Sequence, residues 1–106
     1  MSECLFCRIV SGEIPVEIIV DDPDFVVFKD KFPKAPVHVL VVLRQHLSSL
    51  NVLTPEYQAL MGRVVCRLPA IAKQVGLATG FRTVINTEKA GGQEIFHLHI
   101  HILGGF

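Results

Sequence analysis

The last ten residues of the 106-residue chain are HLHIHILGGF, and this segment constrains the fold more than any other. Three of the five histidines of the chain fall there on alternate positions, separated by leucine and isoleucine. Alternate side chains of a β-strand face the same side, whereas a helix would spread them around its circumference. The segment therefore predicts a strand with one apolar face in the core and one imidazole face made by His97, His99 and His101.

The other segments predict an α+β domain over residues 1–106, with a five-stranded, mostly antiparallel sheet, one short helix and one long helix. A short helix is expected in ECLFCRIVSG, with Ser2 as its N-cap and Gly12 as its stop. Asp22-Pro23-Asp24 predicts the turn of a hairpin. The five strands are expected at EIIVDD, FVVFKD, HVLVVL, FRTVIN and FHLHIHIL.

The long helix is expected to begin at Thr54-Pro55 and to end near Gly76, because apolar residues recur at spacings of three and four between them. Pro69 lies inside this stretch and lacks the N–H that bonds the preceding turn, which predicts a kink or break near Leu68. Cys66 lies on the predicted apolar stripe, so we expect it in the core.

Composition narrows the classes of partner. Ten basic and ten acidic residues leave no net charge, which argues against general binding to nucleic acid or to a membrane surface. The longest apolar stretch, VLVVL, is much shorter than a membrane span, and the N-terminus lacks the pattern of a secretory signal. We therefore expect a cytoplasmic protein. Its three cysteines favour metal binding or burial over disulfides.

Three interpretations fit the histidine ladder: catalysis, a metal site of three histidines, or a packed face. Residues two apart in a strand are about 7 Å apart, so one flat strand rarely brings three ligands onto one ion. Neighbouring imidazoles also disfavour each other's protonation, which keeps a nucleophilic ring neutral near pH 7. Catalysis is therefore the favoured hypothesis.

The sequence resembles the histidine-triad (HIT) family, and within it the Hint-type branch. HLHIHILGG matches the His-x-His-x-His signature with the Leu-Gly-Gly continuation of that branch, and AGGQEIFH matches the approach to it. FKDKFPKAPVHVLVV and GEIP match upstream segments, so the resemblance covers nearly the whole chain. It implies a homodimer that hydrolyses purine nucleoside 5′-monophosphoramidates, and possible activity on aminoacyl adenylates.

The resemblance also implies roles for individual residues. His99 would attack the phosphorus and form a nucleotidyl-histidine intermediate, with His101 on the phosphate or leaving group and His38 setting protonation. His97 is also expected to be a catalytic residue. Donors to the phosphate would come from Asn86 and from backbone N–H groups near Gly92 to Glu94, Gln93 among them. Asp30 would bind the ribose, and an apolar slot for the base would be formed by Phe6, Ile14 and Phe28.

Simpler roles compete with several of these assignments. Phe28 and Ile14 could be ordinary core residues. Asp30 could cap the turn that follows it, and Asn86 could serve a turn at the end of a strand. Glu94 stands where some relatives have a serine. Because an acid there would repel the phosphate, we do not expect Glu94 to be catalytic.

Cys4 and Cys7 form a Cys-x-x-Cys pair, and His46 follows the third strand. Two thiolates and two imidazoles make a tetrahedral zinc set, and in some bacterial HIT proteins the matching positions are Cys4, Cys7, His46 and His97. Four protein ligands would make this zinc structural. A redox pair is the alternative, although its usual βαβ context is missing.

Two other functions remain open: hydrolysis of dinucleoside polyphosphates, and nucleotide binding by an interaction protein with incidental catalysis. The Leu-Gly-Gly ending favours the phosphoramidate hydrolase. The sequence given stops at Phe106, whereas Hint-type relatives continue, so we expect weaker selectivity for the leaving group than in tailed relatives.

Overall fold

The computed structural model describes residues 3–106 and is built around one five-stranded antiparallel sheet in the order β1-β2-β3-β5-β4. The strands are β1 (Val20–Asp21), β2 (Phe25–Lys29), β3 (Val37–Leu43), β4 (Arg82–Val84) and β5 (His99–Gly104). The α-helices are α1 (Leu5–Val10) and α2 (Gln58–Gln74), and three short 3₁₀ turns are η1 (Leu50–Val52), η2 (Pro55–Tyr57) and η3 (Lys89–Gly91). The predicted α+β class and the antiparallel sheet are confirmed.

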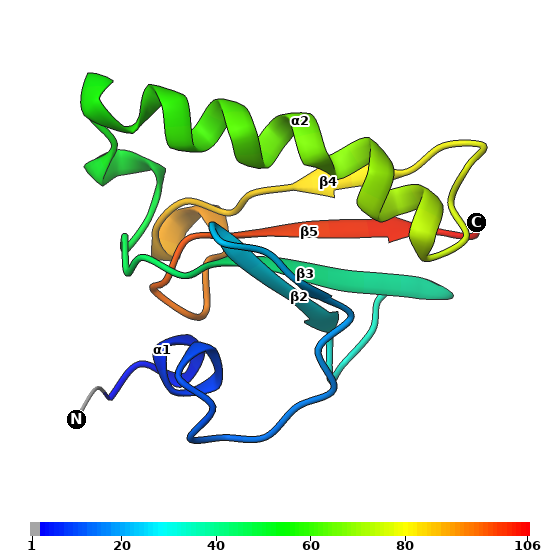
Figure 1. The fold of residues 1–106 in the computed structure, drawn as a ribbon, viewed down its shortest axis with the longest axis horizontal. Helices are drawn as coiled ribbons and strands as arrows, with labels where there is room; N and C mark the ends of the chain where they lie inside the picture. Colours follow the sequence, from blue (N-terminus) through cyan, green and yellow to red (C-terminus); the bar gives the residue numbers. More distant parts are fainter. Residues whose placement is uncertain (1–2) are drawn as a thin grey trace.

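The helices lie on opposite faces of the sheet, as Figure 1 shows. The register pairs Val41 with Ile100, and both belong to the core between the sheet and α2. One residue further along, Leu40 pairs with His101; Leu40 belongs to the smaller core beside α1. Because alternate side chains face the same side of the sheet, the imidazoles of β5 are held on the α1 side by apolar neighbours packed on the α2 side.

Helix α1 begins one residue after Cys4, which is its N-cap and accepts a hydrogen bond through Sγ from the N–H of Cys7 at 3.4 Å. The predicted N-cap, Ser2, lies outside the described residues. The predicted stop is confirmed: Gly12 follows the C-cap with φ of +84°, a left-handed conformation that glycine adopts at little cost.

The start of α2 differs from the prediction. Thr54 precedes the 3₁₀ turn η2 and makes no side-chain cap bond, so the α-helix proper starts at Gln58. Pro69 does not break α2, which runs on to Gln74. Pro69 is exposed, so water can bond the carbonyl that lacks a helical partner. No described helix is long and apolar enough to cross a membrane.

The expectation that Cys66 lies in the core is wrong, because its side chain is exposed. The buried positions of α2 are Val64, Leu68, Ile71 and Ala72. With 3.6 residues per turn, position 66 points about 200° away from position 64. The spacing of apolar residues predicted a wider buried face of α2 than the structure has, and Cys66 lies outside that face.

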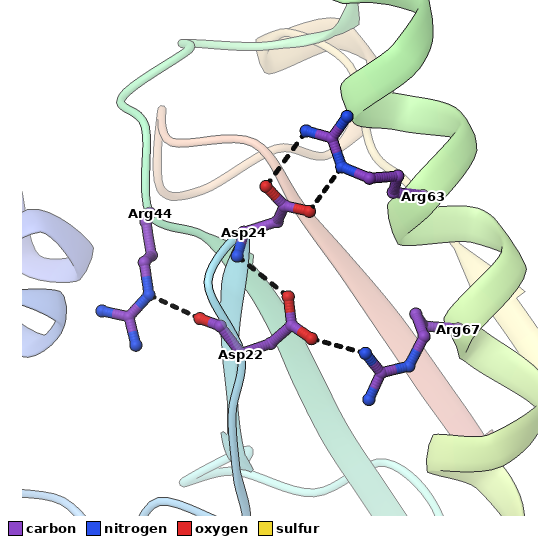
Figure 2. A network of polar contacts seen from close by, with 5 residues as sticks. All are labelled: Asp22, Asp24, Arg44, Arg63 and Arg67. Carbon is purple, nitrogen blue, oxygen red and sulfur yellow. Dashed lines mark hydrogen bonds and ion pairs between the residues drawn. The ribbon is translucent and has the colours of Figure 1, made fainter.

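A polar network joins the β1–β2 turn to α2 and is drawn in Figure 2. The carboxylate of Asp22 accepts from the N–H of Asp24 at 2.9 Å and from Arg67 at 2.5 Å. Asp24 in turn accepts two hydrogen bonds from Arg63, at 2.8 and 3.1 Å, and Arg44 donates to the carbonyl of Asp22 at 2.7 Å. The hairpin is therefore tied to the helix that covers the main core.

Gly104 explains part of the Leu-Gly-Gly ending. A Cβ placed at this position would lie 2.5 Å from a methyl carbon of Leu77, a buried residue that follows α2. Such a contact is too short to persist, so a larger side chain at position 104 would force buried Leu77 to shift. Gly104 therefore lets the end of β5 pack directly beneath the chain that leaves α2.

Candidate active site

A cavity of about 820 Å³ opens on the α1 side of the sheet. It collects nine of the residues predicted from the sequence, drawn from α1, β2, β3, the β4–β5 connection and β5. They are Phe6, Ile14, Phe28, Asp30, His38, Asn86, Gly92, His99 and His101. Two residues predicted for catalysis or substrate binding, Gln93 and His97, do not line it.

His99 is the buried member of the histidine ladder within the cavity wall. Its Nδ1–H donates to the carbonyl of His97 at 2.6 Å, so the lone pair of the neutral ring is on Nε2. Burial lowers the pKa of His99, and its ring meets the edge of Phe6 at a centroid distance of 5.0 Å. The arrangement presents an unprotonated nitrogen on a rigid strand, as nucleophilic catalysis requires.

A second chain of hydrogen bonds fixes the proton positions of His38 and His101. The backbone N–H of Lys34 donates to Nδ1 of His38 at 3.0 Å, which leaves the proton of neutral His38 on Nε2. That Nε2–H donates to Nδ1 of His101 at 2.9 Å. The remaining nitrogen of His101, Nε2, must then carry the proton of the neutral ring.

His101 is neutral at physiological pH. Burial lowers its pKa to about 4, and the neighbouring imidazoles of His99 and His38 act in the same direction. This agrees with the expectation that neighbouring histidines disfavour one another's protonation. The cavity therefore offers a hydrogen-bond donor at His101 Nε2 without a cationic ring.

Asp30 caps a turn and also lines the cavity. Its Oδ1 accepts from the N–H of Phe32 at 2.8 Å, which caps the turn after β2. Its Oδ2 lies 3.3 Å from Nε2 of His38 while the residue lines the cavity. Turn capping therefore fixes the carboxylate and does not compete with a role in binding.

The apolar part of the cavity lies beside α1. Phe6 and Phe28 meet edge to face at a centroid distance of 5.8 Å, and Ile14 packs against the same cluster. Phe28 is buried and still lines the cavity. Core packing and cavity lining are therefore shared by the same residues, since the rings that close the small core also line the cavity.

The loop between β4 and β5 is held by residues that the sequence did not single out. Glu88 has φ of +62°, an uncommon conformation for a residue with a side chain. Its N–H donates to the side chain of Gln93 at 2.8 Å, and its carboxylate accepts from the hydroxyl of buried Ser49 at 2.6 Å. No local motif marks Ser49 or Glu88, because their pairing joins segments distant in sequence.

Gln93 belongs to this support and not to the cavity wall. Its side chain is buried and donates to the carbonyls of Ser48 and Ile95, at 2.7 and 3.1 Å. The backbone N–H groups of Gly92 and Gln93 donate to carbonyls of the same loop at 3.0 Å. These two N–H groups are therefore engaged within the loop, and Asn86 is the side-chain amide that lines the cavity there.

A separate group of side chains has the composition of a metal site. Donor atoms of Cys4, Cys7, His46 and His97 lie within 4.8 Å of one another. Nδ1 of His97 lies 3.4 Å from each sulfur and 3.2 Å from Nδ1 of His46. Tetrahedral zinc, with bonds of about 2.0 Å to nitrogen and 2.3 Å to sulfur, would separate its ligands by about 3.3 to 3.8 Å.

The proton positions of His97 fit the same role. Its Nε2–H donates to the carbonyl of Leu43 at 2.5 Å, so the lone pair is on Nδ1 and points into the group. Burial lowers the pKa of His97, which favours the neutral ring that metals bind. A hydrogen bond from the second nitrogen to a carbonyl is the usual support for a histidine ligand.

Asp30, His38 and His101 also bring donor atoms within 4.8 Å of one another. In this group, the proton positions of the neutral rings exclude a metal site. Nε2 of His38 carries the hydrogen that it donates, because Nδ1 accepts from Lys34. These three side chains therefore form a hydrogen-bonded group and not a set of metal ligands.

Comparison with known proteins agrees with this geometry. The HIT domain family model matches residues 11–106. Protein HitA of Neisseria gonorrhoeae is 49% identical over 104 residues, which cover 98% of this chain and 97% of HitA. The purine nucleoside phosphoramidase of Escherichia coli K12 is 36% identical over 104 residues, covering 97% of this chain and 87% of that protein.

Solved structures give the same result. A HIT family hydrolase from Legionella pneumophila superposes with a TM-score of 0.94 and 36% identity, covering 98% of this chain and 94% of that one. A zinc-bound histidine triad family protein from Mycobacterium smegmatis gives a TM-score of 0.79 and 36% identity, with coverage of 95% and 73%. With its signature strand, sheet topology and matched length, the chain belongs to the HIT domain family.

Proposed function

We propose that the protein hydrolyses purine nucleoside 5′-monophosphoramidates through a covalent intermediate on His99. The observation that carries this proposal is the 2.6 Å hydrogen bond from His99 Nδ1–H to the carbonyl of His97. It leaves Nε2 unprotonated at the wall of a cavity large enough for a nucleotide. The phosphoramidase activity named for the E. coli relative supports the choice of substrate.

The cavity has a part suited to each portion of a nucleotide. The base would lie in the apolar slot of Phe6, Ile14 and Phe28, where stacking and burial of its faces contribute most of the affinity. The ribose hydroxyls would donate to the carboxylate of Asp30, which the turn already holds in place. The phosphoryl group would then lie between Asn86 and the histidines.

The reaction would take place in two displacements. In the first, the lone pair of His99 Nε2 forms a bond to phosphorus while the P–N bond breaks, and the departing amine takes a proton from solvent. In the second, water attacks phosphorus, the bond to His99 breaks, and the attacking water gives one proton to solvent. The Nε2–H of His101 donates to a phosphoryl oxygen throughout, stabilising charge in both transition states.

We also propose that Cys4, Cys7, His46 and His97 hold a structural zinc ion. The lone pair of His97 Nδ1 and the ligand separations support this, as does the likeness to a zinc-bound relative. Four protein ligands fill a tetrahedral shell and leave no position for substrate or water. The ion would therefore stabilise the contact between the N-terminal segment and β5, and the chemistry would belong to the histidines.

Rapid mixing of the protein with adenosine 5′-phosphoramidate, followed by acid-free quenching and mass spectrometry, tests the proposal. We expect an added nucleotidyl mass on the peptide that contains His99, and its absence in His99→Ala, which should still bind AMP. Faster turnover of diadenosine polyphosphates than of the phosphoramidate would favour the alternative hydrolase. Tight AMP binding with turnover near background on both substrates would favour a binding protein.

A further inference from the structure

Glu94 is the acidic residue of the cavity wall that the proposed reaction does not use. It lines the same cavity as Asn86, Gly92 and His99, at the end where the phosphoryl group would lie. Among residues 3–106, its carboxylate makes no hydrogen bond or ion pair. It therefore places a negative charge beside the position of the reacting phosphorus.

The backbone holds Glu94 at this place. The preceding residue, Gln93, is buried, and its side chain is fixed by bonds to Ser48, Glu88 and Ile95. Glu94 itself is exposed at the cavity. The hydrogen bonds of Gln93 therefore fix the backbone that carries Glu94.

No positively charged side chain that the structure describes in the cavity is paired with the carboxylate of Glu94. Its three lysines, Lys29, Lys31 and Lys34, all come from the segment around Asp30, on the side proposed to bind the nucleoside. Lys34 is near enough to His101 to act on its charge, so it can also attract the phosphoryl group. Burial lowers the pKa of His99 and of His101, which line the same cavity, so these rings are neutral and the substrate would have to supply the cation that balances Glu94.

Resting on the proposed function, we propose that Glu94 selects substrates whose leaving amine carries a second, positively charged group. Two negative groups in one cavity repel each other, and a cation bound between them removes that repulsion and gains an ion pair. The favoured substrate class would be nucleoside phosphoramidates of diamines. An acid at this position, although its charge repels the phosphate, would then discriminate between leaving groups.

Two adenosine 5′-phosphoramidates of equal length test this inference, one made with 1,5-diaminopentane and one with hexylamine. We expect the wild-type protein to favour the cationic leaving group about three- to tenfold in kcat/KM, with the preference falling at high salt. In Glu94→Gln the preference should vanish while turnover of the neutral substrate is kept or raised. Glu56→Gln removes the same charge away from the cavity and should retain the preference.

The outcomes separate this inference from the proposed function. Equal wild-type rates on the two substrates, or a preference that survives in Glu94→Gln, would overturn the role of Glu94 and leave the phosphoramidate hydrolase standing. No turnover of either substrate would overturn both. A wild-type rate that rises with Mg²⁺ on both substrates, but not in Glu94→Gln, would also reject the inference, because Glu94 would then bind a metal cation.

Discussion

The Nε2 atom of His38 lies 2.9 Å from Nδ1 of His101, and the proton between them belongs to His38 because Lys34 donates to its other nitrogen. A backbone N–H in the β2–β3 connection thereby decides which nitrogen of His101 carries a proton inside the cavity. The choice of tautomer on β5 depends on a loop more than sixty residues away in sequence.

His38→Ala should therefore lower kcat/KM about 10- to 100-fold, because His101 loses the partner that keeps its proton on Nε2. His38→Gln can place an amide N–H near the same nitrogen, so it should recover part of the loss. Steady-state kinetics of both variants, with AMP binding by calorimetry as the control, would check this. Equal activity in the two variants would contradict a role in positioning the proton.

The stability of the protein should fall as the pH drops from about 6.5 toward 4. His101 has a pKa of about 4 when folded and about 6.5 when unfolded, so in this window the unfolded chain binds more protons. The stabilisation present above pH 6.5 is lost progressively below it, on the order of 2 to 3 kcal/mol for this residue.

Urea unfolding at several pH values in wild type and in His101→Gln would measure this contribution. The variant has no imidazole at position 101, so its free energy of unfolding should vary less over the same range. Comparison of the two proteins removes the effect of acid on the proposed zinc ligands, which both retain. Parallel pH curves would show that His101 titrates alike in the folded and unfolded states.

Cys4→Ser should lower the zinc content and reduce the melting temperature by at least about 5 °C, since the ion would link α1 to β5. Its kcat should fall much less than that of His99→Ala. Cys66→Ser is the matched control, because Cys66 is exposed and lies outside the ligand group. Elemental analysis of protein purified without chelator would measure the metal directly, and wild-type protein without bindable zinc would rule the site out.

Asp22→Ala should destabilise the protein by about 1 to 2 kcal/mol, because the nearly buried carboxylate satisfies both the N–H of Asp24 and Arg67. Asp22→Asn keeps an acceptor for the N–H and should lose less. Asp24→Ala removes an ion pair with exposed Arg63 and should have a smaller effect than Asp22→Ala. Chemical denaturation of the three variants would establish the order.

A homodimer remains a prediction, and the surface supports it in two places. Strand β4 pairs only with β5 among the described residues, and Val65 on α2 is 49% exposed. An unpaired strand edge and an apolar helix face favour association. Light scattering should give twice the chain mass, and Val65→Asp should shift it toward the monomer, whereas Val52→Asp on η1 should not. A wild-type monomer at all concentrations would refute the prediction.

Part of the site could be predicted because one strand carries His99 and His101. Alternation in HLHIHIL sets the faces of β5, and the register with β3 then places His99 and His101 beside Leu40 and Val42. The grouping of Cys4 and Cys7 with two distant histidines agrees with the set expected from the family resemblance.

What could not be predicted depends on contacts between segments. The bond from Lys34 to His38 requires the shape of a particular turn, and the support of Gln93 by Glu88 requires a positive φ that the sequence does not signal. Cys66 was misplaced for a related reason: a periodic pattern gives an apolar stripe but not the width of the stripe that neighbouring strands cover.

His97 takes part in both sites through different atoms: its ring faces the cysteines, and its carbonyl accepts a hydrogen bond from the Nδ1–H of His99. Substitution replaces the ring but never the carbonyl. Metal binding by the ring and support of His99 by the carbonyl can therefore be lost separately in evolution. A lineage could replace the cysteines and this histidine with ordinary packing residues, and the carbonyl would still fix the tautomer of His99. Metal-dependent and metal-free descendants of one ancestor could then share the same reaction.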